Sequence, residues 1–275
     1  MRLDPFAIGE PTDISIVLQN TRLCSRLKFY ALRAGRGLGY VRPRGWHNGS
    51  PRWAPDLVTL PQDSERAVEI PWVASGIANC VGLWLDIGYA HAERRYWESL
   101  PTNGWQRYLR YGYGFDLTEP RDPDPLPTHI IGDLLDYDMH TLPRFDLITC
   151  ISTLEHLGCD NTLYHALAVR RENPFDLQQR VLRQLLTALT RRGTLLVTLP
   201  YGAFQDHGWF LQYDVGMVRR LGEVAADAGR GLRNELYYQL QSEGWRRVPP
   251  GGLEGVCYRP EEWRAAAVVF LEFGC

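Results

Sequence analysis

Long uninterrupted apolar runs are missing from this 275-residue sequence. A membrane-spanning helix needs roughly 20 consecutive apolar residues, so no spanning segment is expected. The first residues, from Met1 to Phe6, do not begin a secretory signal either. The sequence therefore predicts a cytoplasmic protein with no membrane partner.

Closely spaced cysteine pairs are also absent. The six cysteines form no C-x-x-C pair; they are Cys24, Cys80, Cys150, Cys159, Cys257 and Cys275. This spacing argues against a zinc site and against a disulfide framework, so no metal site is predicted from them.

A strong charge of either sign is lacking, because the net charge is only −2. Lysine is nearly absent, with Lys28 as its single instance, and arginine carries the positive charge. The charge is nevertheless uneven. Residues 1–60 hold nine basic and four acidic residues, a balance of +5, which leaves −2 − 5 = −7 for the remainder. The whole chain gives no signal for nucleic acid, but the basic N-terminal segment keeps RNA open as an alternative partner.

Strand and helix patterns alternate along most of the chain. Short apolar stretches predict strands over 81–85, 111–117, 128–133, 145–152 and 194–200, with two closing strands over 235–240 and 267–273. Helical patterns cover 64–78, 91–100, 173–193 and 213–228. Such alternation with short connections predicts an α/β fold: a Rossmann-like, doubly wound, mostly parallel seven-stranded sheet with helices on both faces.

Two regions are expected. Residues 1–62 form an N-terminal arm, partly helical between Ile14 and Leu32, after which repeated glycine and proline break up regular structure. The arm either packs on the main domain or acts as a lid, or as an anion-binding flap that uses Arg42 and Arg44. Residues 63–275 form the main domain.

Three successive predicted strands end in a carboxylate, at Asp86, Asp116 and Asp133. In an open α/β sheet the carboxyl ends of the strands form the edge where ligands bind. One carboxylate can accept two hydrogen bonds from a ribose diol, and another can accept from an exocyclic amine. One acid at such a place is commonplace, but three in strand order indicate a ligand rich in hydroxyls and amines, such as a nucleoside.

The segment 64–275 resembles the class I S-adenosylmethionine-dependent methyltransferases. The motifs that carry the resemblance are Leu85-Asp86-Ile87-Gly88, Gly114-Phe115-Asp116-Leu117, Gly132-Asp133, the stretch from Phe145 to Gly158, and the stretch from Gly193 to Pro200. The part from Phe145 to His156 is the most specific. Residues Glu65, Arg66 and Glu69 also look like what precedes the first motif in sugar and polysaccharide methyltransferases.

The resemblance implies an S-adenosyl-L-methionine cofactor. Gly88 and its neighbours would let the backbone approach the methionine part, Asp116 would bind the ribose hydroxyls, and Asp133 would face the adenine amine. The expected cofactor-binding residues are Asp86, Gly88, Tyr89, Asp116, Leu117, Gly132, Asp133, Leu134 and Ser152.

Two features depart from the family pattern. Further glycines usually follow the first one, whereas Tyr89, Ala90, His91 and Ala92 follow Gly88. The interval from Asp86 to Asp116 is 116 − 86 = 30 residues, against about 20 between such a loop and its ribose acid. A methyltransferase-like interaction module without turnover is therefore an alternative.

Two histidines are candidate catalytic bases, because methylation of a hydroxyl requires removal of its proton. His156 follows the fourth predicted strand, and its alternative role is a helix-start histidine bonded to backbone. His207 follows the fifth strand and is the second candidate. Asp206 and His207 together could instead hold a metal.

The absence of two motifs narrows the chemical class of the methyl acceptor. The fourth strand continues into Ile151-Ser152-Thr153-Leu154, not into the Asn/Asp-Pro-Pro-Tyr motif of adenine amino-group methyltransferases, and no Pro-Cys nucleophile follows it. Trp209, Phe210 and Tyr213 would either stack on an acceptor ring or belong to the core. The prediction is O-methylation of a small molecule, a sugar or a secondary metabolite; the alternative enzyme is an RNA methyltransferase that uses the basic arm.

Overall fold

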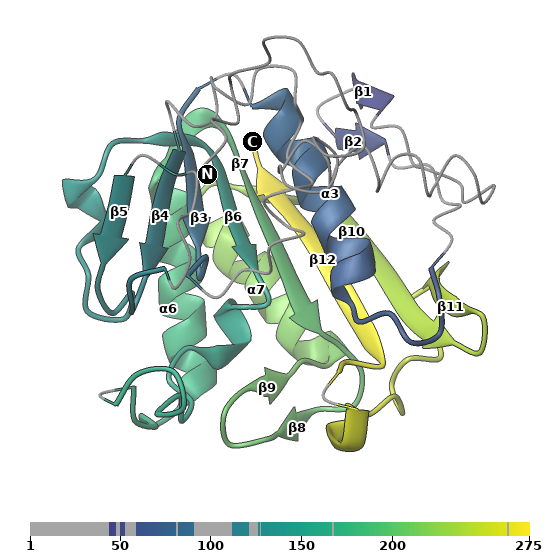
Figure 1. Ribbon diagram of the computed structural model, residues 1–275. Coiled ribbons are helices and arrows are strands. Elements are labelled where there is room, and N and C mark those ends of the chain that lie inside the picture. Colours follow the sequence, from purple (N-terminus) through teal and green to yellow (C-terminus); the bar gives the residue numbers. More distant parts are fainter. Residues whose placement is uncertain are drawn as a thin grey trace, which may run out of the picture.

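The computed structural model describes residues 44–47, 50–52, 59–80, 82–90, 112–120, 126, 128–166, 168–262 and 264–275. Its central feature is an eight-stranded sheet in the order β11-β10-β12-β7-β6-β3-β4-β5 (Figure 1). The strands are β3 (Trp84–Ile87), β4 (Gly112–Asp116), β5 (Thr128–Ile131), β6 (Phe145–Ile151), β7 (Leu189–Pro200), β10 (Gly231–Gln241), β11 (Gly244–Val248) and β12 (Ala267–Gly274).

The strand order is that of a doubly wound sheet. Neighbours from β5 to β7 pair in parallel, whereas β12 lies antiparallel between β7 and β10. Counted along the chain, the six strands that share one direction follow the order 3-2-1-4-5-6 across the sheet, which is the dinucleotide-binding order. The predicted Rossmann-like sheet is confirmed, with one strand more than expected. The strand order reverses between β3 and β6, and such a switch point opens a crevice at the carboxyl ends of the strands.

Helices cover both faces of the sheet. In Figure 1, α3 (Arg66–Asn79) lies in front of the sheet, and α6 (Pro174–Thr187) and α7 (Val215–Asp227) lie behind it. Successive strand residues supply the two faces: Trp84 packs in the cluster that includes helix α3, and Leu85 packs in the cluster that includes α6 and α7. A central strand buried on both faces explains why the stretch before Asp86 reads as continuous apolar sequence.

One predicted boundary is wrong. Arg191, Arg192 and Gly193 do not close helix α6, because α6 ends at Thr187 and β7 already begins at Leu189. The register between β6 and β7 shifts after Phe145, which accommodates the early start of the strand. A Cβ on Gly193 would lie 2.6 Å from the Phe145 carbonyl oxygen, so glycine permits the close approach there.

Smaller elements also differ from expectation. Strand β11 was not predicted and forms a tight hairpin with β10, in which Gln241 pairs with Gly244. Pro174 stands in the first turn of α6 as expected, but Asn173 adopts a left-handed conformation and its side chain does not cap the helix. Short connections are therefore the least predictable part of the chain.

The N-terminal arm is described only in part. Strands β1 (Arg44–His47) and β2 (Ser50–Arg52) pair in antiparallel fashion where glycine and proline predicted no regular structure. The helices expected over 14–32 and 91–100 lie outside the described residues, as does Arg42. Within the described part of the chain, no helix is both long and apolar enough to cross a membrane.

Candidate functional site

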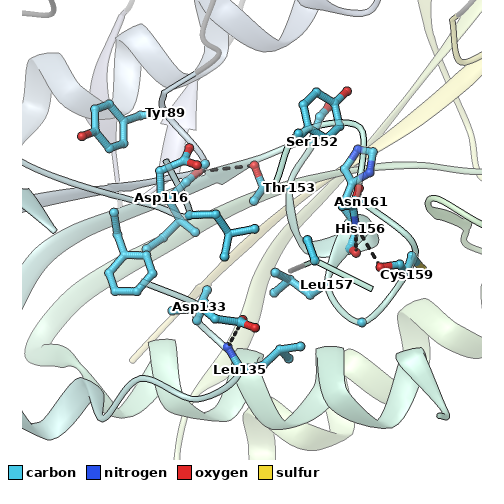
Figure 2. Close-up of a pocket in the computed structure, with 18 of the residues that line it drawn as sticks. Tyr89, Asp116, Asp133, Leu135, Ser152, Thr153, His156, Leu157, Cys159 and Asn161 are labelled. Carbon is cyan, nitrogen blue, oxygen red and sulfur yellow. Dashed lines mark hydrogen bonds between the residues drawn. The ribbon is translucent and has the colours of Figure 1, made fainter. Parts of the chain in front are cut away.

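A cavity of about 310 Å³ opens at the carboxyl edge of the sheet, beside the switch point between β3 and β6 (Figure 2). Its walls come from the segments that follow β3, β4, β5 and β6, together with the first turns of α3. All nine residues expected to bind the cofactor line it: Asp86, Gly88, Tyr89, Asp116, Leu117, Gly132, Asp133, Leu134 and Ser152. Sequence positions spread over 67 residues thus meet around one space.

Asp86 is held rigidly at the end of β3. Its side chain is buried, and Oδ1 accepts a hydrogen bond from the Thr149 hydroxyl at 2.6 Å. That hydroxyl in turn accepts from Nε1 of Trp84 at 2.9 Å. A buried carboxylate needs such donors, and these fix its direction at the cavity wall.

Gly88 allows the turn after β3 to approach Thr153 closely. Its φ is +77°, and a Cβ at this position would overlap the side chain of Thr153. Its N–H donates to the Phe115 carbonyl at 2.9 Å, which joins the turn after β3 to β4. Gly88 is therefore required both by its conformation and by lack of space.

Tyr89 and Ala90 follow Gly88 in place of further glycines, and a hydrogen bond and side-chain packing hold this turn. Asp116 Oδ2 accepts from the N–H of Ala90 at 2.9 Å, so the carboxylate at the end of β4 holds the turn after β3. Tyr89 is buried, and its ring lies over Gly114, where a Cβ would come within 2.5 Å of the ring. Its hydroxyl is 2.7 Å from Nδ1 of His129. Tyr89 and Ala90 are thus packed in place, whereas His91 and Ala92 lie outside the described residues.

Asp133 is engaged on both of its oxygens. Oδ1 accepts from the N–H of Leu135 at 2.9 Å, and Oδ2 accepts from Arg171 at 2.6 Å. Arg171 also pairs with Asp136 at 2.7 Å. Arg171 and Asp133 both line the cavity, so the third acid of the row is part of an ion-pair network.

Ser152 links the cavity to helix α3. It has a positive φ of 42°, which is uncommon for a residue with a side chain. Its hydroxyl donates to Oε1 of Glu69 at 2.9 Å, while Oε2 of Glu69 accepts from Arg66 at 2.7 Å. Burial alone would lower the pKa of Arg66, but the nearby carboxylates of Glu69 and Glu65 outweigh it and raise that pKa. Arg66 is therefore a fixed positive charge in the cavity wall.

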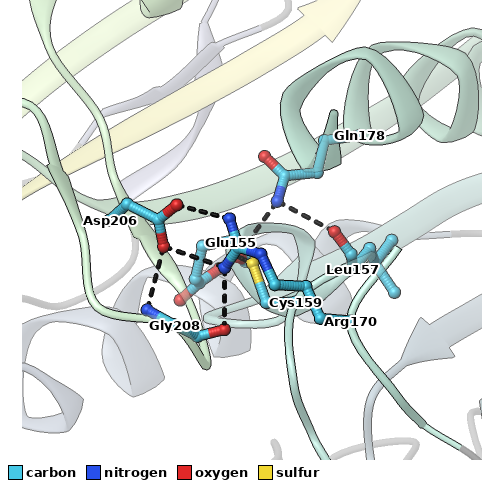
Figure 3. A network of polar contacts seen from close by, with 7 residues as sticks. All are labelled: Glu155, Leu157, Cys159, Arg170, Gln178, Asp206 and Gly208. Atoms are coloured by element: carbon cyan, nitrogen blue, oxygen red, sulfur yellow. Dashed lines mark hydrogen bonds and ion pairs between the residues drawn. The ribbon is translucent and has the colours of Figure 1, made fainter. Parts of the chain in front are cut away.

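The turn after β6 is anchored from beneath. Gln178 on α6 donates to the backbone carbonyls of Glu155 and Leu157, at 3.0 Å each (Figure 3). Its own carbonyl accepts from the Tyr213 hydroxyl at 2.5 Å, so Tyr213 belongs to the core. Burial raises the pKa of Glu155 well above its usual value. The anchored turn, η2 (Leu154–His156), carries the first candidate base.

His156 lines the cavity and is held in one orientation. Its Nδ1 lies 2.9 Å from the Trp209 carbonyl oxygen, an acceptor, which assigns the ring proton to Nδ1 and leaves a lone pair on Nε2. Burial lowers the pKa of His156 to about 4, helped by the charge of Arg66, so the imidazole is neutral at physiological pH. The backbone hydrogen bond that is the alternative, structural role of this histidine is present.

Aromatic rings surround His156. The ring centroids of Trp209, Phe210 and Tyr164 lie 5.2, 5.8 and 6.4 Å from that of the imidazole. Tyr164 lines the cavity as well. Packing against these rings holds the imidazole in place, since aromatic groups pair favourably at such distances.

His207 does not line the cavity. Its ring stacks on Phe210 with centroids 4.4 Å apart, and burial lowers its pKa. The adjacent Asp206 is bound by Arg170 through both carboxylate oxygens, at 3.0 and 2.5 Å (Figure 3). Among the residues with described side chains, no group of three histidine, cysteine or acidic side chains is arranged to hold a metal.

Sequence reasoning missed several wall residues. The clearest is Arg171, and others are Leu135, Leu157, Cys159, Asn161, Tyr164, Ala168 and Val169. Most come from the segment between β6 and α6, which has no periodic pattern. The pair of adjacent arginines, Arg170 and Arg171, was the available signal in the sequence. Only the fold shows that Arg171 lines the cavity and that Arg170 does not.

Comparisons with known proteins give structural likeness only. No protein-family model matches the chain, and no curated protein matches it in sequence. Among solved structures, the 1,6-didemethyltoxoflavin-N1-methyltransferase of Burkholderia thailandensis, with S-adenosylhomocysteine bound, is 11% identical, with 98% of this chain and 94% of that chain covered and a TM-score of 0.45. The CcbJ methyltransferase of Streptomyces caelestis is 14% identical, with coverages of 74% and 88% and a TM-score of 0.46. The magnesium protoporphyrin IX methyltransferase of Synechocystis PCC 6803, with S-adenosylmethionine bound, is 15% identical, with coverages of 92% and 95% and a TM-score of 0.44. TM-scores below 0.5 do not assign this chain to a family.

Proposed function

We propose that this protein is an S-adenosylmethionine-dependent methyltransferase that methylates a hydroxyl group of a small molecule. The observation that supports it most is the convergence of Asp86, Gly88, Asp116 and Asp133 on one cavity at the switch point of a doubly wound sheet. This is the place where such folds bind nucleotides. A cavity of about 310 Å³ is within the range that small-molecule sites have.

The residues present fit the cofactor. Gly88 and Asp116 line the cavity, and Asp116 is an acceptor for a ribose diol. S-adenosylmethionine supplies an activated methyl group on a sulfonium. The protein then has to hold the acceptor in line with that methyl group and exclude competing water.

His156 is the proposed proton acceptor. Nε2 of His156 would accept the hydroxyl proton as the acceptor oxygen takes up the methyl group that the cofactor supplies when bound. The Trp209 carbonyl keeps the ring in the orientation that makes Nε2 available.

The test is calorimetric titration with S-adenosylhomocysteine, comparing Asp116→Asn with Asp138→Asn. Asp138 is the matched control, because it also accepts a backbone N–H, from His140 at 2.9 Å, but does not line the cavity. We expect Asp116→Asn to weaken binding at least tenfold and Asp138→Asn to leave it unchanged. Absence of binding by the unmodified protein at millimolar ligand would overturn the proposal.

A further inference from the structure

Arg171 occupies the position where the sequence predicted recognition of the cofactor base. Three of the five N–H donors of its guanidinium are used: one N–H donates to Asp133, and two donate to Asp136. The other two donors have no hydrogen-bond partner within the described part of the chain. Arg171 is 35% exposed at its side chain and lines the cavity, so these groups are accessible to a ligand.

Asp133 is a poor hydrogen-bond acceptor for a neutral amine of a ligand, because both of its oxygens already have donors. Its Oδ2 already receives a charged donor at 2.6 Å, and its Oδ1 receives the Leu135 N–H at 2.9 Å. Charged hydrogen bonds are about twice as strong as neutral ones, so the guanidinium is the stronger partner of Asp133. Asp136 holds the same guanidinium from the other side, at 2.7 Å, and this second pairing adds to the cost of moving it.

The walls beside Arg171 suit a flat, apolar ring. Phe115, Leu134 and Leu135 line this end of the cavity and are themselves buried. A guanidinium plane stacks on aromatic rings, and its remaining N–H groups can donate to a ring nitrogen. The face of the ring and its N7 atom are common to adenine and hypoxanthine.

We propose that Arg171 binds the base of the nucleoside cofactor, that Asp133 and Asp136 orient its guanidinium, and that the site does not require the exocyclic amine of adenine. This assignment rests on the proposed function and names a specificity-determining residue for it. It predicts a site that accepts purine nucleosides with or without the amine.

The first test compares S-adenosylhomocysteine with S-inosylhomocysteine on the unmodified protein by calorimetry. Their dissociation constants are expected to agree within threefold. A loss of tenfold or more on replacing the amine by a keto group would show that a carboxylate reads the amine, and it would overturn the assignment. This comparison needs no variant, so it holds even if a variant folds poorly.

The second test compares Arg171→Leu with Arg170→Leu. Arg170 is the matched control, because it adjoins Arg171 and pairs with Asp206 but does not line the cavity. Arg171→Leu should lower the affinity for S-adenosylhomocysteine at least tenfold, and Arg171→Lys should lower it less. Arg170→Leu should change this affinity less than twofold.

Unchanged or tighter binding by Arg171→Leu would mean that the guanidinium only blocks Asp133. This result would overturn the assignment but leave the proposed function standing. Failure of the unmodified protein to bind either nucleoside would overturn the proposed function and the assignment with it.

Discussion

The hydroxyl of Ser152, at the end of β6, donates to the buried carboxylate of Glu69 on α3 at 2.9 Å. Glu69 is fully buried and carries Arg66 on its other oxygen, at 2.7 Å. One carboxylate therefore joins a helix that precedes the sheet to the strand end that borders the cavity, and it supports the positive φ of Ser152.

Replacement of Glu69 by glutamine should destabilise the protein by about 3 kcal/mol, because Arg66 would face an amide in place of its counter-charge. Urea unfolding measures this change. Glu243→Gln is the matched control, since Glu243 also pairs with an arginine three residues away, Arg246, but is 80% exposed. Its effect should stay within about 0.5 kcal/mol. Equal effects of the two substitutions would contradict the role assigned to Glu69.

Gly88→Ala should cost more than a positive φ alone explains. Gly88 and Gly229 have φ values of +77° and +70°, but an added Cβ would overlap Thr153 only at Gly88, whereas nothing lies within 4 Å at Gly229. We expect a loss of about 3 kcal/mol for Gly88→Ala. Gly229→Ala should cost about 1 kcal/mol, the left-handed penalty alone. Thermal unfolding with and without S-adenosylhomocysteine separates the two variants, because only Gly88→Ala should also weaken the binding of this ligand.

His156 should make the protein less stable in acid. Its pKa in the folded state is about 4, below the 6.5 of an exposed histidine, so the unfolded chain binds more protons between these values. Stability is therefore fully present above pH 6.5 and falls as the pH drops towards 4, by roughly 3 kcal/mol for this group. Urea unfolding at pH 4.5 and pH 7 measures the slope.

His156→Asn should remove that slope, because asparagine does not titrate. Its amide nitrogen takes the place of Nδ1 and can still donate to the Trp209 carbonyl. With any hydroxyl acceptor that supports turnover, the same variant should lower kcat by about 100-fold or more while leaving the affinity for S-adenosylhomocysteine unchanged. A variant with the full kcat would remove His156 as the proton acceptor.

Glu272 should have the opposite dependence on pH. It is fully buried on β12, and burial raises its pKa to about 7 against the opposing charge of Arg233. The folded chain therefore binds more protons than the unfolded one between about pH 4.5 and pH 7, and stability falls as the pH rises through that window. Glu272→Gln should stabilise the protein by about 2 kcal/mol at pH 8, and hardly at all at pH 4.5. A gain of equal size at both pH values would show that the benefit is not electrostatic.

Much of the candidate site could be predicted because it depends on strand ends. Asp86, Asp116 and Asp133 each follow a short apolar stretch, and parallel strands bring their carboxyl ends to one edge whatever the loops between them do. His156 was within reach for the same reason, since it follows β6. Position relative to a strand is local information, and the sequence contains it.

The partners of these residues could not be predicted in this way. Arg171 meets Asp133 across 38 residues, and Ser152 meets Glu69 across 83. His207 lies only six residues after Tyr201, where β7 has just ended, yet the β8–β9 hairpin (Gln205–Asp206 and Leu211–Gln212) places it against Phe210 instead of the cavity. Such contacts depend on where loops without periodic pattern turn.

The amino-acid sequence by itself determined the alternation of strands and helices, the acids at the strand ends and the glycine at the first turn, because burial and backbone conformation act over a few neighbouring residues. Only the tertiary structure decided that Asp133 is bound by an arginine, that His156 is neutral and oriented by the Trp209 carbonyl, and that β12 runs antiparallel between β7 and β10. Charge pairing and desolvation are properties of groups brought together from distant parts of the chain, and no local pattern encodes them.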